Sequence, residues 1–177
     1  ITSEKNHQAE LEESEERFRN LIMQSPVAKA ILSGEDHIVE IANDALLKNI
    51  WRKNSADVIG RKVLDVFPEL KKQQYAKLLQ EVYATGVKHT GKESFMWING
   101  DDGLVHYYVD FEYAPVFSSD NIVSGIKITA VDVTEKVKAR KQIEESEKRF
   151  RSLAESLPQL VWETDEKGNA LFASGRW

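Results

Sequence analysis

Residues 104–117 read LVHYYVDFEYAPVF, and this stretch decides the fold because its side chains alternate between two kinds. One set is apolar or aromatic and comprises Tyr107, Val109, Phe111 and Tyr113. The other set is polar and comprises His106, Asp110 and Glu112. A period of two places the sets on opposite faces of a β-strand. The stretch therefore predicts a strand with one face in a core and the other in water.

Two further strands are expected beside it, at 90–98 and 122–131, because turn-rich segments at 99–103 and 118–121 separate the three. A shorter pair, 28–33 and 37–41, flanks the hairpin signal Gly34-Glu35-Asp36. Helices are predicted at 43–51 and 71–85, and between them a short turn from 55 to near Gly60 and a packed segment at 63–67. This order predicts an α+β domain, a five-stranded antiparallel sheet with helices on one face.

Two amphipathic helices are expected to flank the sheet domain, at about 3–23 and 134–156. The apolar residues of the first are Leu11, Phe18, Leu21 and Ile22. Those of the second are Val137, Ile143, Phe150 and Leu153. The spacing is close to that of a heptad, although the stripe is thin. Two interpretations stay open: each stripe docks on its own domain, or the helices pair in a homodimer.

The chain repeats one motif, since ESEERFRNL at 13–21 returns as ESEKRFRSL at 145–153. A proline follows each copy, Pro26 and Pro158. The spacing matches the size of a small domain, so we expect one complete module and the opening of a second, within a longer protein. The expected parts are an N-terminal helix 1–23, a domain 24–133, a C-terminal helix 134–156 and a truncated second domain 157–177. Its hairpin, 161–165 with 169–172, is expected to be poorly anchored.

Composition excludes several classes of protein. The formal net charge of -5 with charges of mixed sign argues against a nucleic-acid surface. The absence of cysteine excludes disulfides, thiolate catalysis and a cysteinyl flavin. No apolar run is long enough to span a bilayer and no signal peptide is evident, so the chain is expected to be cytoplasmic, without membrane contact of its own.

Three further motifs carry a family resemblance. They are IVEIAN at 38–43, VIGRKVLDVFP at 58–68 and DVTE at 132–135. In this order, after the entry helix that contains 13–21, they resemble a PAS domain, the sensory module of bacterial signalling proteins. The resemblance covers about 13–135 and begins again at 145–177. It implies a ligand or chromophore site in the interior and a signal that leaves through the C-terminal helix.

The larger side chains expected between helices and sheet are Trp51, Phe67, Tyr75, Leu79, Phe95, Trp97, Phe111 and Tyr113. They are first of all a core. The resemblance makes them the candidate lining of a pocket, and their few polar groups favour a small apolar or aromatic ligand. A filled core without ligand is the alternative.

The junction between the last strand and the C-terminal helix is the second candidate site. Asp132 or Thr134 can cap the start of that helix, and Glu135 lies favourably at its positive end. An ordinary cap is one interpretation. The resemblance implies the other, because PAS domains hand their signal to the output helix at this place.

Evidence for catalysis or a metal is lacking in the sequence. His7, His37, His89 and His106 lack metal-ligand spacing, so no metal site is predicted. The resemblance makes His89 the nearest candidate for a haem ligand, although related haem proteins place the histidine on the long helix. A noncovalent flavin stays open, and no cofactor is assigned. Asp110 and Glu112 share a face, but a solvated one, which disfavours an acid–base pair.

The sequence thus predicts a PAS sensory or relay domain of a bacterial two-component protein, with a sensor histidine kinase as the parent enzyme. No catalytic residue is assigned to this stretch itself. Expected partners are a second copy and the neighbouring PAS and output domains. The alternatives are a ligand-free dimerisation or spacer module, and a PAS sensor of a cyclase, phosphodiesterase or transcription regulator.

Overall fold

A computed structural model describes residues 2–156 and 162–173 of the chain. The chain divides into two compact units, Ile1–Thr134 and Glu135–Trp177. The first unit begins with the helix α1 (Thr2–Met23) and contains one five-stranded sheet. The strands are β1 (Ala28–Ser33), β2 (Ile38–Ala42), β3 (His89–Gly100), β4 (Gly103–Phe117) and β5 (Val123–Asp132).

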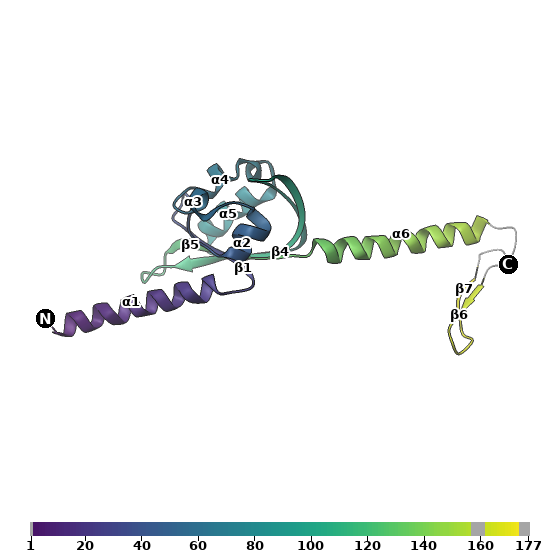
Figure 1. Cartoon of the computed structure of the whole chain (residues 1–177), viewed down its shortest axis with the longest axis horizontal. Helices are drawn as coiled ribbons and strands as arrows, with labels where there is room; N and C mark the ends of the chain where they lie inside the picture. The colour runs from purple at the N-terminus through teal and green to yellow at the C-terminus, as the bar shows by residue number, and fades with distance from the viewer. Residues whose placement is uncertain (1, 157–161, 174–177) are drawn as a thin grey trace. The chain divides into compact units, whose positions relative to one another are not determined.

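The sheet has the order β2-β1-β5-β4-β3, and each neighbouring pair is antiparallel. The chain therefore crosses from the β1–β2 hairpin to β3 at the far edge and returns through β4 to β5 in the centre. Figure 1 shows the short helices between β2 and β3 gathered on one face of the curved sheet. This is the α+β arrangement that the sequence predicts.

The crossover consists of five short helices. They are α2 (Asp44–Leu46), the π-helix η1 (Leu47–Trp51), α3 (Ser55–Val58), α4 (Val63–Val66) and the 3₁₀-helix η2 (Pro68–Lys72). The longer helix α5 (Gln74–Thr85) follows and ends at Gly86, whose positive φ of 65° suits a C-cap glycine. The helix expected from residue 71 thus begins at Gln74, because Gln73 is extended and separates η2 from α5.

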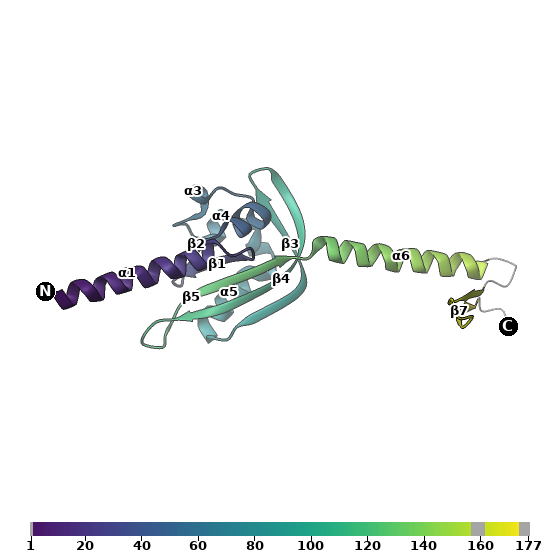
Figure 2. The ribbon, with the colours of Figure 1, turned by 60° about the horizontal axis from the view of Figure 1, so that its bottom comes forward.

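One core joins this helical layer to the inner face of the sheet. Its fully buried side chains include Phe67, Tyr75 and Leu79 from the helices and Ile98 and Ile126 from the sheet. The predicted alternation of β4 is confirmed, because Tyr107, Val109, Phe111 and Tyr113 are buried there and the residues between them are at least partly exposed. Figure 2 shows β5, β4 and β3 side by side.

A second small cluster lies on the outer face of the sheet and holds the end of α1. It consists of Ile22, Ile31 and Ile41. Ile31 lies opposite Ile41 and Leu32 opposite Val39, so one extra residue of β2 interrupts the ladder between these pairs. Such a bulge reverses which side chains face inward. Val39 therefore joins the main core while Ile41 turns outward to contact Ile22.

The second unit contains the helix α6 (Thr134–Ser156) from Glu135 onward and the strands β6 (Trp162–Thr164) and β7 (Ala170–Ala173). The two strands pair antiparallel, as the second hairpin in the sequence predicts. Phe172 of β7 contacts Phe150 of α6, with ring centroids 5.8 Å apart. Pro158 and the expected segment 157–161 lie outside the described residues.

Candidate functional site

The predicted ligand site is the space between the helices and the inner face of the sheet. Trp51, Phe67, Tyr75, Leu79, Phe111 and Tyr113 are all buried there in one core. Packed rings fill much of it, since Trp51 lies 5.0 Å from Phe67 and Tyr75 lies 5.3 Å from Phe111, between centroids. The cavity that remains has a volume of about 30 Å³ and is lined by five of these six residues, because Phe67 does not reach it. That is roughly the volume of one water molecule in the liquid.

Burial disfavours the charged form of two phenols in this interior. It raises the pKa of Tyr113 far above its usual range, and it also raises the pKa of Tyr75. The Tyr75 hydroxyl donates a hydrogen bond to the main-chain oxygen of Phe95, at 3.0 Å. The interior thus offers apolar surface with few polar groups, as the sequence analysis expects.

The placement of Phe95 and Trp97 in this lining is wrong. In the β3–β4 ladder Met96 lies opposite Tyr107 and Ile98 opposite Val105. Met96 and Ile98 are therefore the buried residues of β3, and they line the cavity. Phe95 is 48% exposed and Trp97 is half-buried, because the register turns them to the outer face.

On that outer face Phe95 is the centre of an aromatic cluster. Its ring lies 6.2 Å from Trp97, 5.5 Å from His106 and 5.5 Å from Tyr108. Sequence reasoning missed this cluster. The alternation along the strand could have revealed it, because Phe95 and Trp97 lie on one face of β3 and Met96 and Ile98 lie on the other.

The second candidate site is the connection between β5 and α6, which we call the exit junction (Asp132, Val133 and Thr134, with Tyr108 of β4). The carboxylate of Asp132 accepts a hydrogen bond from the main-chain N–H of Thr134, at 2.9 Å. The Thr134 hydroxyl oxygen accepts from the N–H of Tyr108, at 2.9 Å, and the N–H of Val133 donates to the Tyr108 oxygen, at 2.8 Å. Asp132 therefore binds a main-chain N–H at the start of α6, whereas Thr134 connects the start of α6 to β4 of the sheet.

Glu135 lies exposed in the first turn of α6, the position where a carboxylate complements the helix dipole. Its side chain pairs with Lys138, at 3.2 Å. The contribution of such an exposed pair is small. The geometry thus assigns different contacts to the three predicted junction residues.

A matching connection at the other end of the domain was not predicted as a site. We call it the entry junction: the buried Asn43 and the groups that it binds. The Asn43 amide donates to three main-chain oxygens, those of Ile22 (3.1 Å), Ser25 (3.1 Å) and Val27 (2.8 Å). Its side-chain oxygen accepts from the N–H groups of Lys29 and Leu46, at 3.0 and 3.1 Å. One side chain thus connects α1, β1 and α2, and the predicted helix-opening role of Asn43 is only part of its work.

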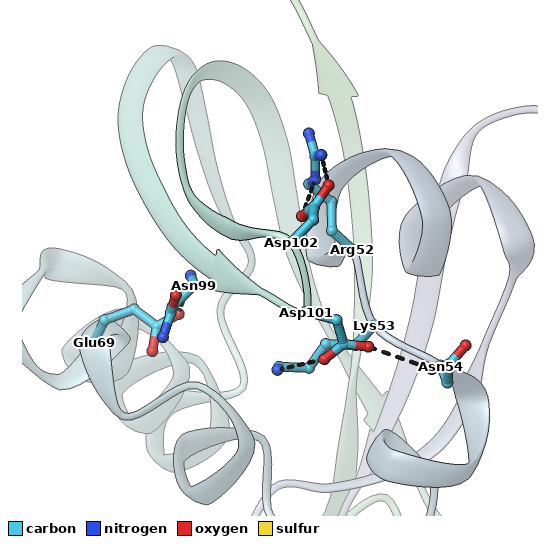
Figure 3. A network of polar contacts seen from close by, with 7 residues as sticks. All are labelled: Arg52, Lys53, Asn54, Glu69, Asn99, Asp101 and Asp102. Atoms are coloured by element: carbon cyan, nitrogen blue, oxygen red, sulfur yellow. Dashed lines mark hydrogen bonds and ion pairs between the residues drawn. The ribbon is translucent and has the colours of Figure 1, made fainter.

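A polar network fastens the β3–β4 turn to the end of η1 (Figure 3). Arg52 pairs with Asp102, and Lys53 pairs with Asp101 at 3.2 Å. The Asn54 amide also donates to Asp101, at 3.3 Å, and the Asp101 N–H donates to the Arg52 oxygen, at 2.9 Å. Arg52 has a left-handed conformation that turns the chain toward this hairpin. These contacts hold the hairpin against the helical layer.

The side chains considered for catalysis or haem lie elsewhere. On the outer face Asp110 pairs with Lys92 at 3.0 Å and Glu112 with Lys88 at 3.3 Å. His89 is exposed and stacks beside Phe111, with centroids 5.9 Å apart. Within residues 2–156 and 162–173, no three acidic or histidine side chains are grouped as metal ligands. Nor is any helix in those ranges both long and apolar enough to cross a membrane.

A family model described as a PAS fold matches residues 23–138. The chain belongs to the PAS family. As a PAS domain, this region is a sensory and signalling module and is not itself catalytic. The matched region contains the interior cavity, the exit junction and all of the entry junction except Ile22.

Solved structures agree with this fold. The PAS domain of BvgS from Bordetella pertussis has a TM-score of 0.58 at 18% identity, over 77% of this chain and 98% of that chain. A PAS domain from Colwellia psychrerythraea has a TM-score of 0.54 at 13% identity, over 68% and 97%. An RNA-binding light-oxygen-voltage receptor has a TM-score of 0.58 at 20% identity, over 76% of this chain but 37% of that chain. At these identities the likeness shows the fold alone.

Proposed function

We propose that the chain is a cytoplasmic relay PAS domain of a bacterial two-component protein, whose output domain is a sensor histidine kinase. The exit junction carries this proposal. Thr134, the first residue of α6, is bonded to Tyr108 of β4, and Asp132 holds the N–H of the same residue. A change in sheet packing at β4 would therefore reach the start of α6 directly.

A relay needs two arrangements whose balance the stimulus can shift. A ligand or a neighbouring domain shifts it only by contacting the two arrangements with different free energies. The interior cavity of about 30 Å³ favours a relay whose core is already filled. Drug-sized ligands occupy pockets of roughly 300–1,000 Å³, so an apolar ligand in the interior would require the core to expand.

Pairing of two copies through the flanking helices is part of the proposal. Three apolar side chains of α1 are at least half exposed: Leu11, Phe18 and Leu21. Three of α6, namely Ile143, Phe150 and Leu153, recur at the same spacing and are also exposed. This spacing of seven and then three residues is that of a coiled-coil seam. A second copy would cover these side chains.

Autophosphorylation of the full-length protein tests the function. We expect transfer of the γ-phosphate of ATP to a histidine, and a severalfold change of its rate in Asp132→Ala. Thr129→Val, on β5 outside the exit junction, is the control and should leave the rate unchanged. No phosphohistidine would refute the kinase parent, and equal rates in all three proteins would refute the relay role of the exit junction.

A ligand-free spacer is the second candidate, favoured by the same small cavity. A native mass spectrum set beside the denatured mass separates it from a ligand sensor. A dimer without excess mass supports a relay or spacer, whereas excess mass that is lost on denaturation identifies a bound ligand. A bare monomer would contradict pairing through α1 and α6.

A further inference from the structure

A cleft of about 670 Å³ lies at the β1–β2 turn, between that turn and α5. Its polar lining residues are Ser33, Glu35, Asp36, His37, Gln80 and Tyr83. None of the residues that line this cleft also lines the interior cavity. The cleft is therefore a separate place on the domain, and the relay described above makes no use of it.

His37 lies in the wall of the cleft and is only 4% exposed. Its main chain is fixed by two hydrogen bonds, from its N–H to Gly34 and from the N–H of Val63 to its oxygen. These hold it at a φ of 52°, which is uncommon for a residue other than glycine. Its ring lies edge-on to Tyr83 of α5, with centroids 5.7 Å apart.

The Nδ1 atom of His37 has no hydrogen-bond partner among the residues that the structure describes. Buried polar atoms without a partner are rare in folded proteins, and each needs an explanation. An uncommon backbone conformation here places a buried imidazole, with an unpartnered nitrogen, in the wall of a cleft. Because Nδ1 itself is fully buried, a molecule bound in the cleft would contact the other groups that line it.

The charged side chains at the cleft indicate which chemical class of ligand it would bind. Asp36 is paired with Lys62, at 2.7 Å, so these two charges offset one another. Glu35 is exposed at the cleft and adds a further negative charge. Tyr83 contributes an aromatic ring, against which the apolar part of a ligand can pack. The cleft thus combines a carboxylate with an aromatic surface.

We propose that this cleft is a second binding site, which takes a small organic ammonium ion. The ammonium group would pair with Glu35, and its apolar part would lie along Tyr83. Charge-assisted hydrogen bonds of this kind are stronger than neutral ones. An anion of the same size would be repelled by Glu35.

The cleft is also joined to the exit junction through β5. The N–H of Gly34, in the turn, donates to the oxygen of Ser124, at 2.8 Å. From there β5 runs beside β1 to Asp132. The proposal that the cleft binds a ligand does not depend on the relay function. Any effect of that binding on α6 rests on the proposed relay function.

A titration of the full chain with n-butylammonium chloride, followed by ¹H–¹⁵N spectra at constant ionic strength, tests the site. We expect shifts up to about 20 mM ligand, a concentration suited to weak fragment binding. They should be confined to the amides of residues 33–38 and 80–84. Shifts that lie instead on the interior lining, such as Tyr75 and Leu79, or no shifts at the cleft, would overturn the proposal.

Two variants of matched chemistry sharpen this test. Glu35→Gln should weaken binding by about fivefold, the upper range for one exposed charge pair. Glu40→Gln, an exposed change on β2 outside the cleft, should leave the affinity unchanged. Equal affinity in both variants would overturn the proposal. Because the titration reports binding and not output, failure of the relay function would leave its result unaltered.

Discussion

The entry and exit junctions perform the same task, since each joins a long helix to the sheet, but they are built differently. At the entry junction a fully buried Asn43 makes five hydrogen bonds, and Ile22 is buried against Ile31 and Ile41. At the exit junction Asp132 is exposed and Thr134 is buried, and the side chain of each accepts one hydrogen bond.

This difference teaches which connection can move. Breaking the entry junction would remove five hydrogen bonds of one buried side chain, which costs more than losing the single bond of the exposed Asp132. At the exit junction the bond of Asp132 can be lost at a cost of about 0.5–1.5 kcal/mol, while the two bonds to Tyr108 remain. The entry junction is therefore suited to anchor α1, and the exit junction to transmit a change.

The largest effect is expected for Asn43→Ala, which should lower the free energy of unfolding by about 3 kcal/mol. The change removes a helix cap and the side-chain donor of three main-chain oxygens, of which that of Ile22 keeps the N–H of Ser25. Urea unfolding measures it. Asn49→Ala, an exposed position in η1, is the control and should stay within about 0.5 kcal/mol. Similar losses in both variants would remove the basis of the comparison.

The next effect is expected for Ile22→Ala, about 2 kcal/mol in the same measurement. This is the lower end for deleting a buried isoleucine side chain, because the outer cluster is small. Leu21→Ala is its matched control, since Leu21 is 68% exposed, and it should change stability by less than about 0.5 kcal/mol. If Leu21 mattered as much as Ile22, α1 would be anchored by another face.

Thr134→Val should cost about 1 kcal/mol, because it removes the acceptor of the Tyr108 N–H while keeping the side-chain shape. Thermal or urea unfolding detects the loss. Thr129→Val, on β5, should be nearly neutral by comparison. A loss as large as that of Asn43→Ala would show that the exit junction is no weaker than the entry junction.

The smallest effect concerns the opposite end of β1 and β2, where burial lowers the pKa of His37 below its usual 6.5. The unfolded chain then binds the proton more readily than the folded one. The stabilisation is therefore complete above the unfolded-state pKa and is lost as the pH falls through the folded-state pKa.

Comparison with His37→Asn isolates the contribution of His37 protonation to the free energy of unfolding, because asparagine tolerates a positive φ. Unfolding measured at several pH values should show the stability of the wild type relative to the variant falling toward acid pH. The side chains facing His37 are Glu35 and Asp36 from the turn and Tyr83 from α5. A difference that does not vary with pH would contradict this account.

The sequence is informative wherever periodicity alone determines the outcome. The alternation of Tyr107, Val109, Phe111 and Tyr113 places β4 correctly, and the apolar spacing places both long helices. The capping role of Asp132 also follows from its position before a helix. These features are local, so a single stretch of chain specifies each of them.

Other features depend on partners that are distant in the sequence. Phe95 and Trp97 were assigned to the core by size, but the pairing of Met96 with Tyr107 turns them outward. Ile41 faces α1 only because a bulge interrupts the β1–β2 ladder. Asn43 is predicted as a helix cap, yet its contacts with Ile22 and Ser25 require the folded chain.

Hydrogen exchange in Asp132→Ala tests most directly the claim that the exit junction is a local, adjustable connection. We predict that the first-turn amides of α6, from Thr134 to Lys136, exchange about tenfold faster, as expected for loss of one cap. The amides of β4 and β5 should keep their protection. If those amides lost protection in parallel with the first turn of α6, the account would be contradicted, because Asp132 would then support the whole sheet.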